Sequence, residues 1–303
     1  MATHAARAAL ASIKLDPKAV DSAIFGNVAQ TSSDAAYLAR HIALKADMAI
    51  HTPALTLNRL CGSGMQAVIS AMQEIQLGQA SVVLAGGTES MSQAPYAVRN
   101  IRFGTQLGTN PPFEDTLWAA LTDSYAKVPM GITAENLAEK YKISREEVDK
   151  FAQRSQQLWG EAEKAGVFKA EIAPIEVASK KGPKVLGSDE GPRPETTLET
   201  LAKLKPVFKK EGVVTAGTAS GITDGAAALV VASEESVNRL NLTPLAEIVS
   251  YSYVGVEPTL MGIGPVPAVQ AALKRAKLTI NDIDLFEVRR VARRCPTGRT
   301  GGR

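Results

Sequence analysis

The chain has 303 residues, of which 45% are hydrophobic and 21% are charged. This balance is typical of a globular protein and excludes a disordered or fibrous chain, and the length favours two domains or one domain with a large insertion. Two cysteines, Cys61 and Cys295, are too few for a disulfide framework or a four-cysteine zinc site, which favours a reducing compartment. No apolar run reaches the roughly 20 residues that a membrane span needs.

The net charge of +3 is concentrated at the C-terminus. Residues 289–303 contain six arginines and no acidic residue, so subtracting their +6 leaves residues 1–288 with a net charge of −3. A basic run of this kind can contact nucleic acid or an anionic surface. It lacks the interleaved aromatic residues that would make such binding specific, and we expect no nucleic-acid partner.

Helical and extended patterns alternate along the N-terminal part of the chain. The run ASVVLAG has the continuous apolar character of a strand that is buried on both faces. The alternation indicates an α/β fold. Apolar spacing predicts helices over residues 5–13, 32–46 and 64–77, and strands over residues 20–28, 53–58 and 80–86.

The middle of the chain, from about Thr88 to Val213, is richer in proline and charge and is interpreted as an insertion in the α/β core. We expect two helices in it, over 133–141 and 144–166, capped by Thr133 and by Ser144 with Glu147. The segment KKGPKVLGSDEGPRP (180–194) is predicted to be a loop. After the insertion, AAALVVA (226–232) is expected to return to the sheet.

A helix–turn–strand phrase occurs twice, at a fixed offset of 263 residues. Ala8 corresponds to Ala271, and Asp21 corresponds to Asp284. The same offset holds through the helix, the turn and the strand, which indicates a duplicated half. The alternative is that helix–turn–strand units resemble one another by composition alone. In the second copy a strand over 245–254 precedes the helix. Its counterpart would lie ahead of Met1, so we expect both halves to be incomplete.

The strongest candidate for chemistry is Cys61, in the segment NRLCGSGMQ (58–66). The pattern predicts a strand, a small-residue turn and a helix, so Cys61 lies at or just before a helix N-terminus. Unpaired backbone N–H groups and the helix dipole stabilise a thiolate there. Gly62 and Gly64 leave room for a substrate and allow an N–H group to face an oxyanion. The alternative is a structural cysteine in a glycine-rich turn.

A cysteine nucleophile also needs a base, and the sequence contains three histidines. His51 begins the strand that ends near Cys61, so at about 3.3 Å per residue the two are roughly 25 to 30 Å apart. His41 is expected on the preceding helix and His4 near the N-terminus, both at the surface. None of the three is placed to activate Cys61, which disfavours a cysteine hydrolase.

Several motifs together resemble the thiolase family, and in particular its fatty-acid oxidation branch. The likeness extends from about Ala5 to Val288, with the motifs in the order of the family. They are NRLCGSGMQ (58–66), AGGTESMSQAPY (85–96), PMGITAENLA (129–138), TAGTASGITDGAAA (215–228) and MGIGPVPA (261–268).

The resemblance implies a layered αβαβα sandwich made of two similar halves. Residues 1–87 and 214–240 would form the N-terminal half, which lacks its opening strand. Residues 88–213 would form an inserted loop domain. Residues 241–288 would begin the C-terminal half, and 289–303 would be a tail foreign to the family.

The resemblance also implies an activity and a set of site residues. Cys61 would be the acyl-carrying nucleophile in the thiolytic cleavage of a 3-ketoacyl-CoA to acetyl-CoA and a shortened acyl-CoA. Met130, Arg193 and Phe208 would line the CoA channel, and Ser220 would hydrogen-bond the pantetheine. Acyl-CoA and CoA would be the substrates, with no metal and no other cofactor. The family forms homodimers or homotetramers, in the mitochondrial matrix or alternatively in peroxisomes.

The chain departs from the family pattern after Val288. The Asn-Glu-Ala-Phe, Gly-His-Pro and Cys-x-Gly-Gly-Gly motifs are absent from the sequence, and Cys295 in CPTGRTGGR does not match the last of them. Thr218 also stands where the family usually has Asn. We therefore expect a chain shortened at both ends, unstable and largely inactive, with a tail from a shifted reading frame or an alternative exon.

Two other functions stay open at this point. A biosynthetic acetoacetyl-CoA thiolase would share the same motifs, although Pro129, where short-chain relatives often have a histidine, favours the oxidation branch. A non-catalytic acyl-CoA-binding or partner subunit would bind CoA without acylation of Cys61.

Overall fold

The computed structural model of the chain describes residues 1–178 and 182–288, in two compact units. In the described part, no helix is both long and apolar enough to cross a bilayer. The predictions for the arginine-rich segment 289–303 and for Cys295 fall outside the described residues. Among the described residues, the first unit contains Met1–Ala120, Ile172–Ser188 and Ile222–Ile248, and the second contains Leu121–Glu171, Asp189–Gly221 and residues 249–288.

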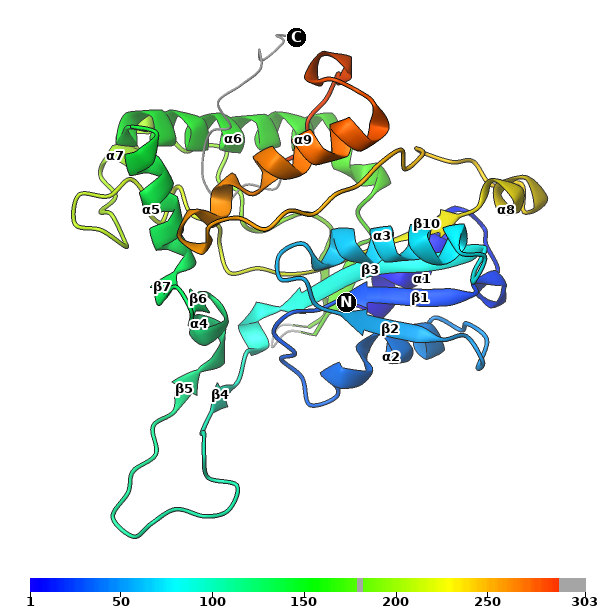
Figure 1. Ribbon diagram of the computed structural model, residues 1–303, viewed down its shortest axis with the longest axis horizontal. Coiled ribbons are helices and arrows are strands. Elements are labelled where there is room, and N and C mark those ends of the chain that lie inside the picture. The colour runs from blue at the N-terminus through cyan, green and yellow to red at the C-terminus, as the bar shows by residue number, and fades with distance from the viewer. Residues whose placement is uncertain (179–181, 289–303) are drawn as a thin grey trace. The chain divides into compact units, whose positions relative to one another are not determined.

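A four-stranded sheet with the strand order β10-β3-β1-β2 forms the centre of the first unit (Figure 1). β1 (Ser22–Gly26) lies between β2 (Ala54–Leu57) and β3 (Val82–Ser90) and is parallel to both. β10 (Asp224–Ala232) pairs antiparallel with β3 along its whole length. The predicted return of the chain to the sheet is therefore confirmed.

The other elements of the first unit are helices and two small pairs of strands. The hairpin strands are β4 (Tyr96–Ala97) with β5 (Glu114–Asp115), and β8 (Ile175–Val177) with β9 (Lys184–Leu186). The helices are α1 (Ala2–Ser12), α2 (Leu38–Lys45), α3 (Ser63–Gln76), α4 (Thr116–Ala120) and α8 (Glu234–Arg239), with 3₁₀ turns η1 (Pro17–Ala19), η2 (Ala35–Tyr37) and η3 (Met91–Gln93).

Both faces of the central strands are buried. Phe25 and Leu84 pack with α1 and α2 on one face, and Ile24 and Val83 pack with α3 on the other. Successive side chains of a strand point to opposite faces. Because helices cover both faces, these strands are continuous apolar runs, and the α/β interpretation from the sequence is confirmed.

The second unit is mainly helical. α6 begins with the predicted capping box, in which the Ser144 hydroxyl accepts from Glu147 N and the Glu147 carboxylate accepts from Ser144 N. It ends at Gly166, which is left-handed with a φ of 72°. The elements are β6 (Thr122–Asp123), β7 (Val128–Pro129), α5 (Met130–Lys140), α6 (Arg145–Ala165), α7 (Leu198–Ala202), α9 (Pro265–Ala276), and 3₁₀ helices η4 (Val167–Ala170), η5 (Pro258–Ile263) and η6 (Ile280–Asp282).

Three expectations about helix and loop limits were wrong. α5 begins at Met130 rather than at Thr133, whose hydroxyl donates to the Met130 carbonyl from inside the helix. The helix expected from residue 32 begins only at η2, because Ser32 and Asp34 hydrogen-bond one another in a turn. Within the predicted loop 180–194, β9 forms an antiparallel ladder with β8.

The repeat appears in the helices but not in the strands. α1 and α9 start at Ala2 and Pro265, and η1 and η6 start at Pro17 and Ile280, so both pairs differ by 263. The strand expected over 245–254 does not form, because no other strand pairs with it among the described residues. A β-strand needs a neighbour for its backbone hydrogen bonds, and sequence pattern alone does not supply one.

A substitution at Gly86 tests how tightly the sheet is packed. A Cβ atom at this position would lie 2.2 Å from the Ala227 carbonyl oxygen and 2.6 Å from the Phe25 ring. We expect Gly86→Ala to lower the free energy of unfolding by about 1 to 3 kcal/mol through overpacking, measured by urea denaturation. Gly225→Ala is the control, since a Cβ there meets no atom within 4 Å; equal midpoints for the two variants would contradict this packing.

Candidate active site

Cys61 lies in the turn that joins β2 to α3, and its side chain is exposed. β2 ends at Leu57 and α3 starts at Ser63, with Gly62 as its N-cap residue. This is the strand–turn–helix arrangement that the sequence predicts. The first turn of α3 has no acidic side chain, so the positive end of the helix dipole is not neutralised locally.

The residue before Cys61 has an unusual backbone. Leu60 has a φ of +47°, in the left-handed region, which costs a non-glycine residue roughly 1–2 kcal/mol. Such a conformation persists only where surrounding interactions hold it. The Asn58 side-chain oxygen accepts from Leu60 N at 2.8 Å, and Leu60 O accepts from Ser63 N at 3.0 Å.

Ser63 contributes the buried part of this support. Its side chain is 4% exposed, and its hydroxyl accepts from Arg59 N at 2.8 Å and donates to Leu60 O at 2.6 Å. One hydroxyl therefore joins the start of α3 to both residues before Cys61. Gly62 N donates to Arg59 O at 3.0 Å and closes the turn.

Glycines at the ends of the parallel strands allow α3 to lie close to the sheet. A Cβ at Gly26, the last residue of β1, would lie 2.6 Å from the Ser63 Cβ, and a Cβ at Gly87 would lie 3.4 Å from the Gly64 Cα. Any side chain at Gly26 would push the helix start away. The close approach places Cys61 at the carboxyl edge of the sheet, where α/β folds bind their ligands.

The three histidines lie elsewhere in the first unit. His4 is on α1 and His41 is on α2, the helices of the face opposite α3. His41 stacks on Tyr37, with ring centroids 5.5 Å apart, and contacts Asp34 at 3.2 Å. The Ser32 hydroxyl, and after it His41, hold the pKa of Asp34 below its usual value.

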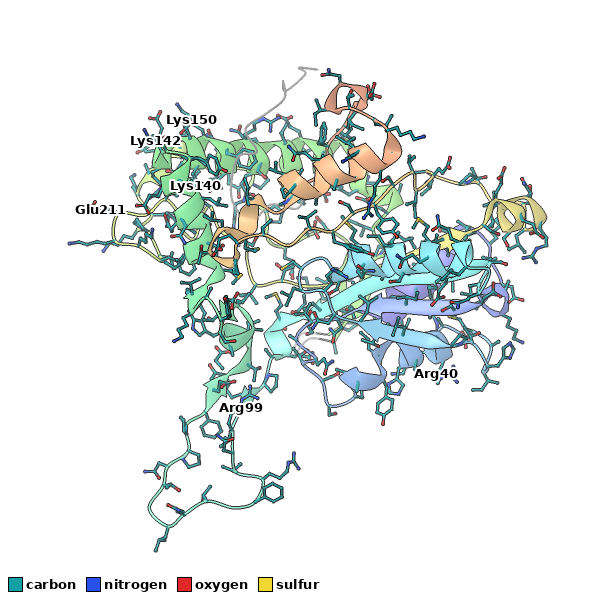
Figure 2. All side chains as sticks on the ribbon, in the orientation of Figure 1. Arg40, Arg99, Lys140, Lys142, Lys150 and Glu211 are labelled. Atoms are coloured by element: carbon teal, nitrogen blue, oxygen red, sulfur yellow. The ribbon has the colours of Figure 1, made fainter. Side chains whose placement is uncertain are left out.

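His51 is held at the far end of β2 from Cys61. Arg40, labelled in Figure 2, donates from α2 to the carbonyls of Ile50 and Thr52 on either side of it. These bonds attach the segment before β2 to α2, whereas Cys61 follows the last residue of β2. No histidine of the chain therefore flanks the Cys61 turn.

Two of the glycine-rich motifs meet at the end of β3. Asp224, the first residue of β10, accepts hydrogen bonds from the Ser92 hydroxyl, from Ser92 N at 2.9 Å and from the Ser90 hydroxyl at 3.3 Å. The Ser92 hydroxyl is the main cause of a lowered pKa for Asp224. Thr88 also donates to Gly225 O. These bonds attach the AGGTESMS segment to the start of β10.

Glu89 forms a second cluster at this edge of the sheet. Its carboxylate accepts from Val28 N at 2.9 Å, Ala29 N at 3.2 Å and the Asn27 side-chain amide at 3.0 Å. Glu89, Asn58 and Ser63 were not among the site residues predicted from the sequence. The sequence signal that could have identified Glu89 is an acidic residue within a run of small residues at the end of a strand.

Two of the four residues predicted to contact CoA lie together in the second unit. Met130 begins α5, and a Cβ on the next residue, Gly131, would lie 2.1 Å from the Phe208 ring. The Phe208 ring therefore lies against the start of α5, and Gly131 is the residue that permits this contact.

Arg193 and Ser220 have different surroundings. The Arg193 guanidinium donates to carbonyls of its own loop, from Glu190 to Pro192, and its backbone N–H donates to Gln156 on α6. Ser220 is exposed and follows a turn in which the Thr218 hydroxyl accepts from Thr215 N at 2.8 Å.

The turn before Ser220 is anchored by a buried carboxylate on α5. Glu135 is 3% exposed and accepts from Val213 N and Val214 N, both at 2.9 Å. It connects the PMGITAENLA motif to the segment that leads into TAGTASG. No group of three or more His, Cys, Asp or Glu side chains in the described ranges is arranged to hold a metal ion.

The Cys61 turn and the glycine-rich segments at this sheet edge are among the motifs that carry the thiolase resemblance of the sequence. The model of the thiolase N-terminal domain matches residues 1–235, and that of the thiolase C-terminal domain matches residues 242–292. This chain belongs to the thiolase family.

Individual relatives are similar over most of the chain. Mitochondrial 3-ketoacyl-CoA thiolase of Homo sapiens is 58% identical over 288 residues, which cover 95% of this chain and 72% of that protein. The crystal structure of human mitochondrial 3-ketoacyl-CoA thiolase has 57% identity and a TM-score of 0.94, covering 96% of this chain and 74% of that chain. The human enzyme in complex with CoA has a TM-score of 0.93, at 57% identity over 96% and 73% of the two chains. The predicted family and fold are confirmed.

Ser63 should be the side chain on which the Cys61 turn most depends. In Ser63→Ala the Arg59 N–H loses the hydroxyl that accepts from it and the Leu60 carbonyl loses one of its two donors, keeping the Ser63 N–H, and we expect a loss of about 1 to 3 kcal/mol in the free energy of unfolding. Urea denaturation measures it. Ser70→Ala on the same helix, which loses only a bond from the Gln66 side chain, should change stability by less than about 0.5 kcal/mol; a smaller loss in Ser63→Ala than in Ser70→Ala would refute this role.

Proposed function

We propose that this chain acts as a thiolase on 3-ketoacyl-CoA, with Cys61 as the nucleophile that carries the acyl group. The observation that carries the proposal is the exposed Cys61 thiol on a braced turn before α3. The relatives support the substrate class, since the human protein is named a 3-ketoacyl-CoA thiolase and its crystal structure includes a CoA complex.

The proposed reaction has two steps. The Cys61 thiolate attacks the 3-keto carbon, the bond between C2 and C3 breaks, and the departing C2 carbon accepts a proton to leave as acetyl-CoA. A second CoA then gives up its thiol proton and attacks the acyl-Cys61 thioester, which releases a shortened acyl-CoA and regenerates the Cys61 thiolate. Backbone N–H groups at a helix start can stabilise the oxyanion of both steps.

Residues of the second unit are proposed to contact CoA. Met130 and Phe208 offer apolar surface at the start of α5, and Ser220 offers an exposed hydroxyl for the pantetheine. Arg193 is proposed to shape the channel as well as line it, because its guanidinium holds its own loop. CoA is proposed as a substrate, with no metal or further cofactor.

Domain organisation and assembly are part of the same proposal. Residues 1–87 with 214–240, and 241–288, are proposed as two related halves, with 88–213 as the insertion; the common offset of α1 with α9 supports this. Leu55, Leu60 and Met65 are 47%, 65% and 71% exposed around the edge strand β2. Such apolar surface beside a strand edge that pairs with no other strand in the described part of the chain favours a homodimer or homotetramer. The names of the relatives favour a mitochondrial location over a peroxisomal one.

Turnover by the 303-residue polypeptide is proposed to be slow. No histidine flanks Cys61, and the Asn-Glu-Ala-Phe, Gly-His-Pro and Cys-x-Gly-Gly-Gly motifs do not occur in the sequence. General acid–base help is worth about 10²- to 10⁴-fold, and one oxyanion-hole donor about 10²- to 10³-fold. Acylation of Cys61 is only one of the two steps of the reaction, so it needs fewer of these groups than the complete catalytic cycle.

Acylation of Cys61 is the direct test. On incubation with acetyl-CoA we expect mass spectrometry to find an acetyl group on the peptide that contains Cys61, at a rate well above that of a cysteine in a short peptide. Cys61→Ala should abolish the adduct, and Cys295→Ala should retain it. CoA binding by calorimetry without any adduct would instead support an acyl-CoA-binding subunit, and rapid thiolysis of a 3-ketoacyl-CoA would contradict the slow turnover.

The proposed CoA contact at Phe208 can be tested through its neighbour. In Gly131→Ala the new methyl group would overlap the Phe208 ring and displace it. We expect the Kd for CoA, measured by isothermal titration calorimetry, to rise about tenfold, which corresponds to about 1.4 kcal/mol. Gly255→Ala, where a Cβ meets no atom within 4 Å, should leave the Kd unchanged, and an unchanged Kd in both variants would remove Phe208 from the CoA site.

A further inference from the structure

Two carboxylates bind backbone N–H groups at opposite ends of the same pair of parallel strands. Asp21, just before β1, accepts from Ser81 N at 2.8 Å and Val82 N at 2.9 Å, where β3 begins. Glu89, near the end of β3, accepts from Val28 N and Ala29 N, just after β1. We call each carboxylate together with its two backbone N–H partners a clamp. The Asp21 clamp and the Glu89 clamp have the same chemistry, and each joins β1 to β3.

Of these two clamps, the Glu89 clamp is the one that further hydrogen bonds connect to the Cys61 turn. The carbonyl of Val28, whose N–H is held by Glu89, accepts from the Asn58 side-chain amide at 3.3 Å. The oxygen of the same Asn58 amide accepts from Leu60 N at 2.8 Å. Leu60 is the left-handed residue that directly precedes Cys61. An unbroken series of hydrogen bonds therefore runs from Glu89 to the turn that carries the thiol.

The burial of the clamp makes its loss costly. Asn27, which donates to both Glu89 and the Thr88 carbonyl, is 6% exposed. Removing the carboxylate leaves the N–H groups of Val28 and Ala29 without an acceptor in a half-buried loop. The loop would move to find other partners, and Asn58 would lose the fixed carbonyl that orients its amide.

We propose that Glu89 is a positioning residue for Cys61, acting through residues 27–29 and Asn58 on the backbone of Leu60; this rests on the proposed function of Cys61. Glu89 does not touch the reacting atoms. It sets the direction from which the thiol meets the substrate, so its loss affects reactions that demand a defined geometry. Acyl transfer from a substrate thioester needs such a defined geometry. Alkylation by iodoacetamide does not, because this reagent is small enough to reach an exposed thiol in many orientations.

The test compares Glu89→Gln with Asp21→Asn in the full chain. Three quantities are measured for each: the urea midpoint, the ratio of the rate of Cys61 acetylation by acetyl-CoA to the rate of its alkylation by iodoacetamide, and amide hydrogen exchange in the peptide containing Leu60. We expect both variants to lower the midpoint. Only Glu89→Gln should lower the rate ratio, at least fivefold, and speed exchange at Leu60.

A second variant keeps the test decisive if Glu89→Gln does not fold. Asn58→Asp retains an acceptor for Leu60 N but replaces the donor to the Val28 carbonyl by an oxygen, at an exposed position. It should lower the rate ratio with little change in the midpoint. Equal effects of Glu89→Gln and Asp21→Asn on the ratio and on exchange at Leu60 would overturn the proposal.

The same measurements separate this proposal from the function itself. If the unmodified chain is never acetylated at Cys61, the proposed nucleophile fails. Hydrogen exchange at Leu60 then still shows whether Glu89 controls the turn: faster exchange in Glu89→Gln than in Asp21→Asn supports the connection, and equal exchange refutes it.

Discussion

The close approach of α3 to the ends of β1 and β3 is the constraint on which the candidate site depends. Gly26 and Gly87 leave no side chain between the strands and the first turn of the helix, so Ser63 can lie directly against β1. In the short turn before the helix, Leu60 adopts a left-handed backbone conformation. Cys61 is exposed at this edge because the residues on both sides of it are held in place.

Carboxylate side chains satisfy the backbone of irregular segments in both units. Each of Glu89, Asp224 and Glu135 accepts from at least one backbone N–H group in a segment distant in the sequence. Buried or half-buried N–H groups need an acceptor, and a carboxylate can satisfy several at once. The acidic residues within the small-residue motifs are therefore explained by backbone support, before any contact with a substrate is considered.

Each unit carries residues named in the proposed function. The first carries Cys61, the proposed nucleophile, beside an α/β sheet, and the second carries Met130, Phe208 and Ser220, which are proposed to bind CoA. Gly131 in the second unit has a role like that of Gly26 in the first, because each leaves room for a close contact at the start of a helix. In both units, the positions of glycines determine which side chains are brought together.

The local sequence pattern was sufficient to predict much of the fold and part of the candidate site. The apolar runs of β1 and β3, the capping box of α6, and Cys61 before a helix follow from neighbouring residues in the chain. The 263-residue offset of α1 and α9 follows from comparing two segments of the sequence. The tertiary structure alone decided that 245–254 has no strand partner, that α5 starts at Met130, and that Glu89 and Asn58 connect to the Cys61 turn. Periodicity and capping are properties of adjacent residues, whereas pairing of strands and hydrogen bonds between distant segments exist only once the chain has folded.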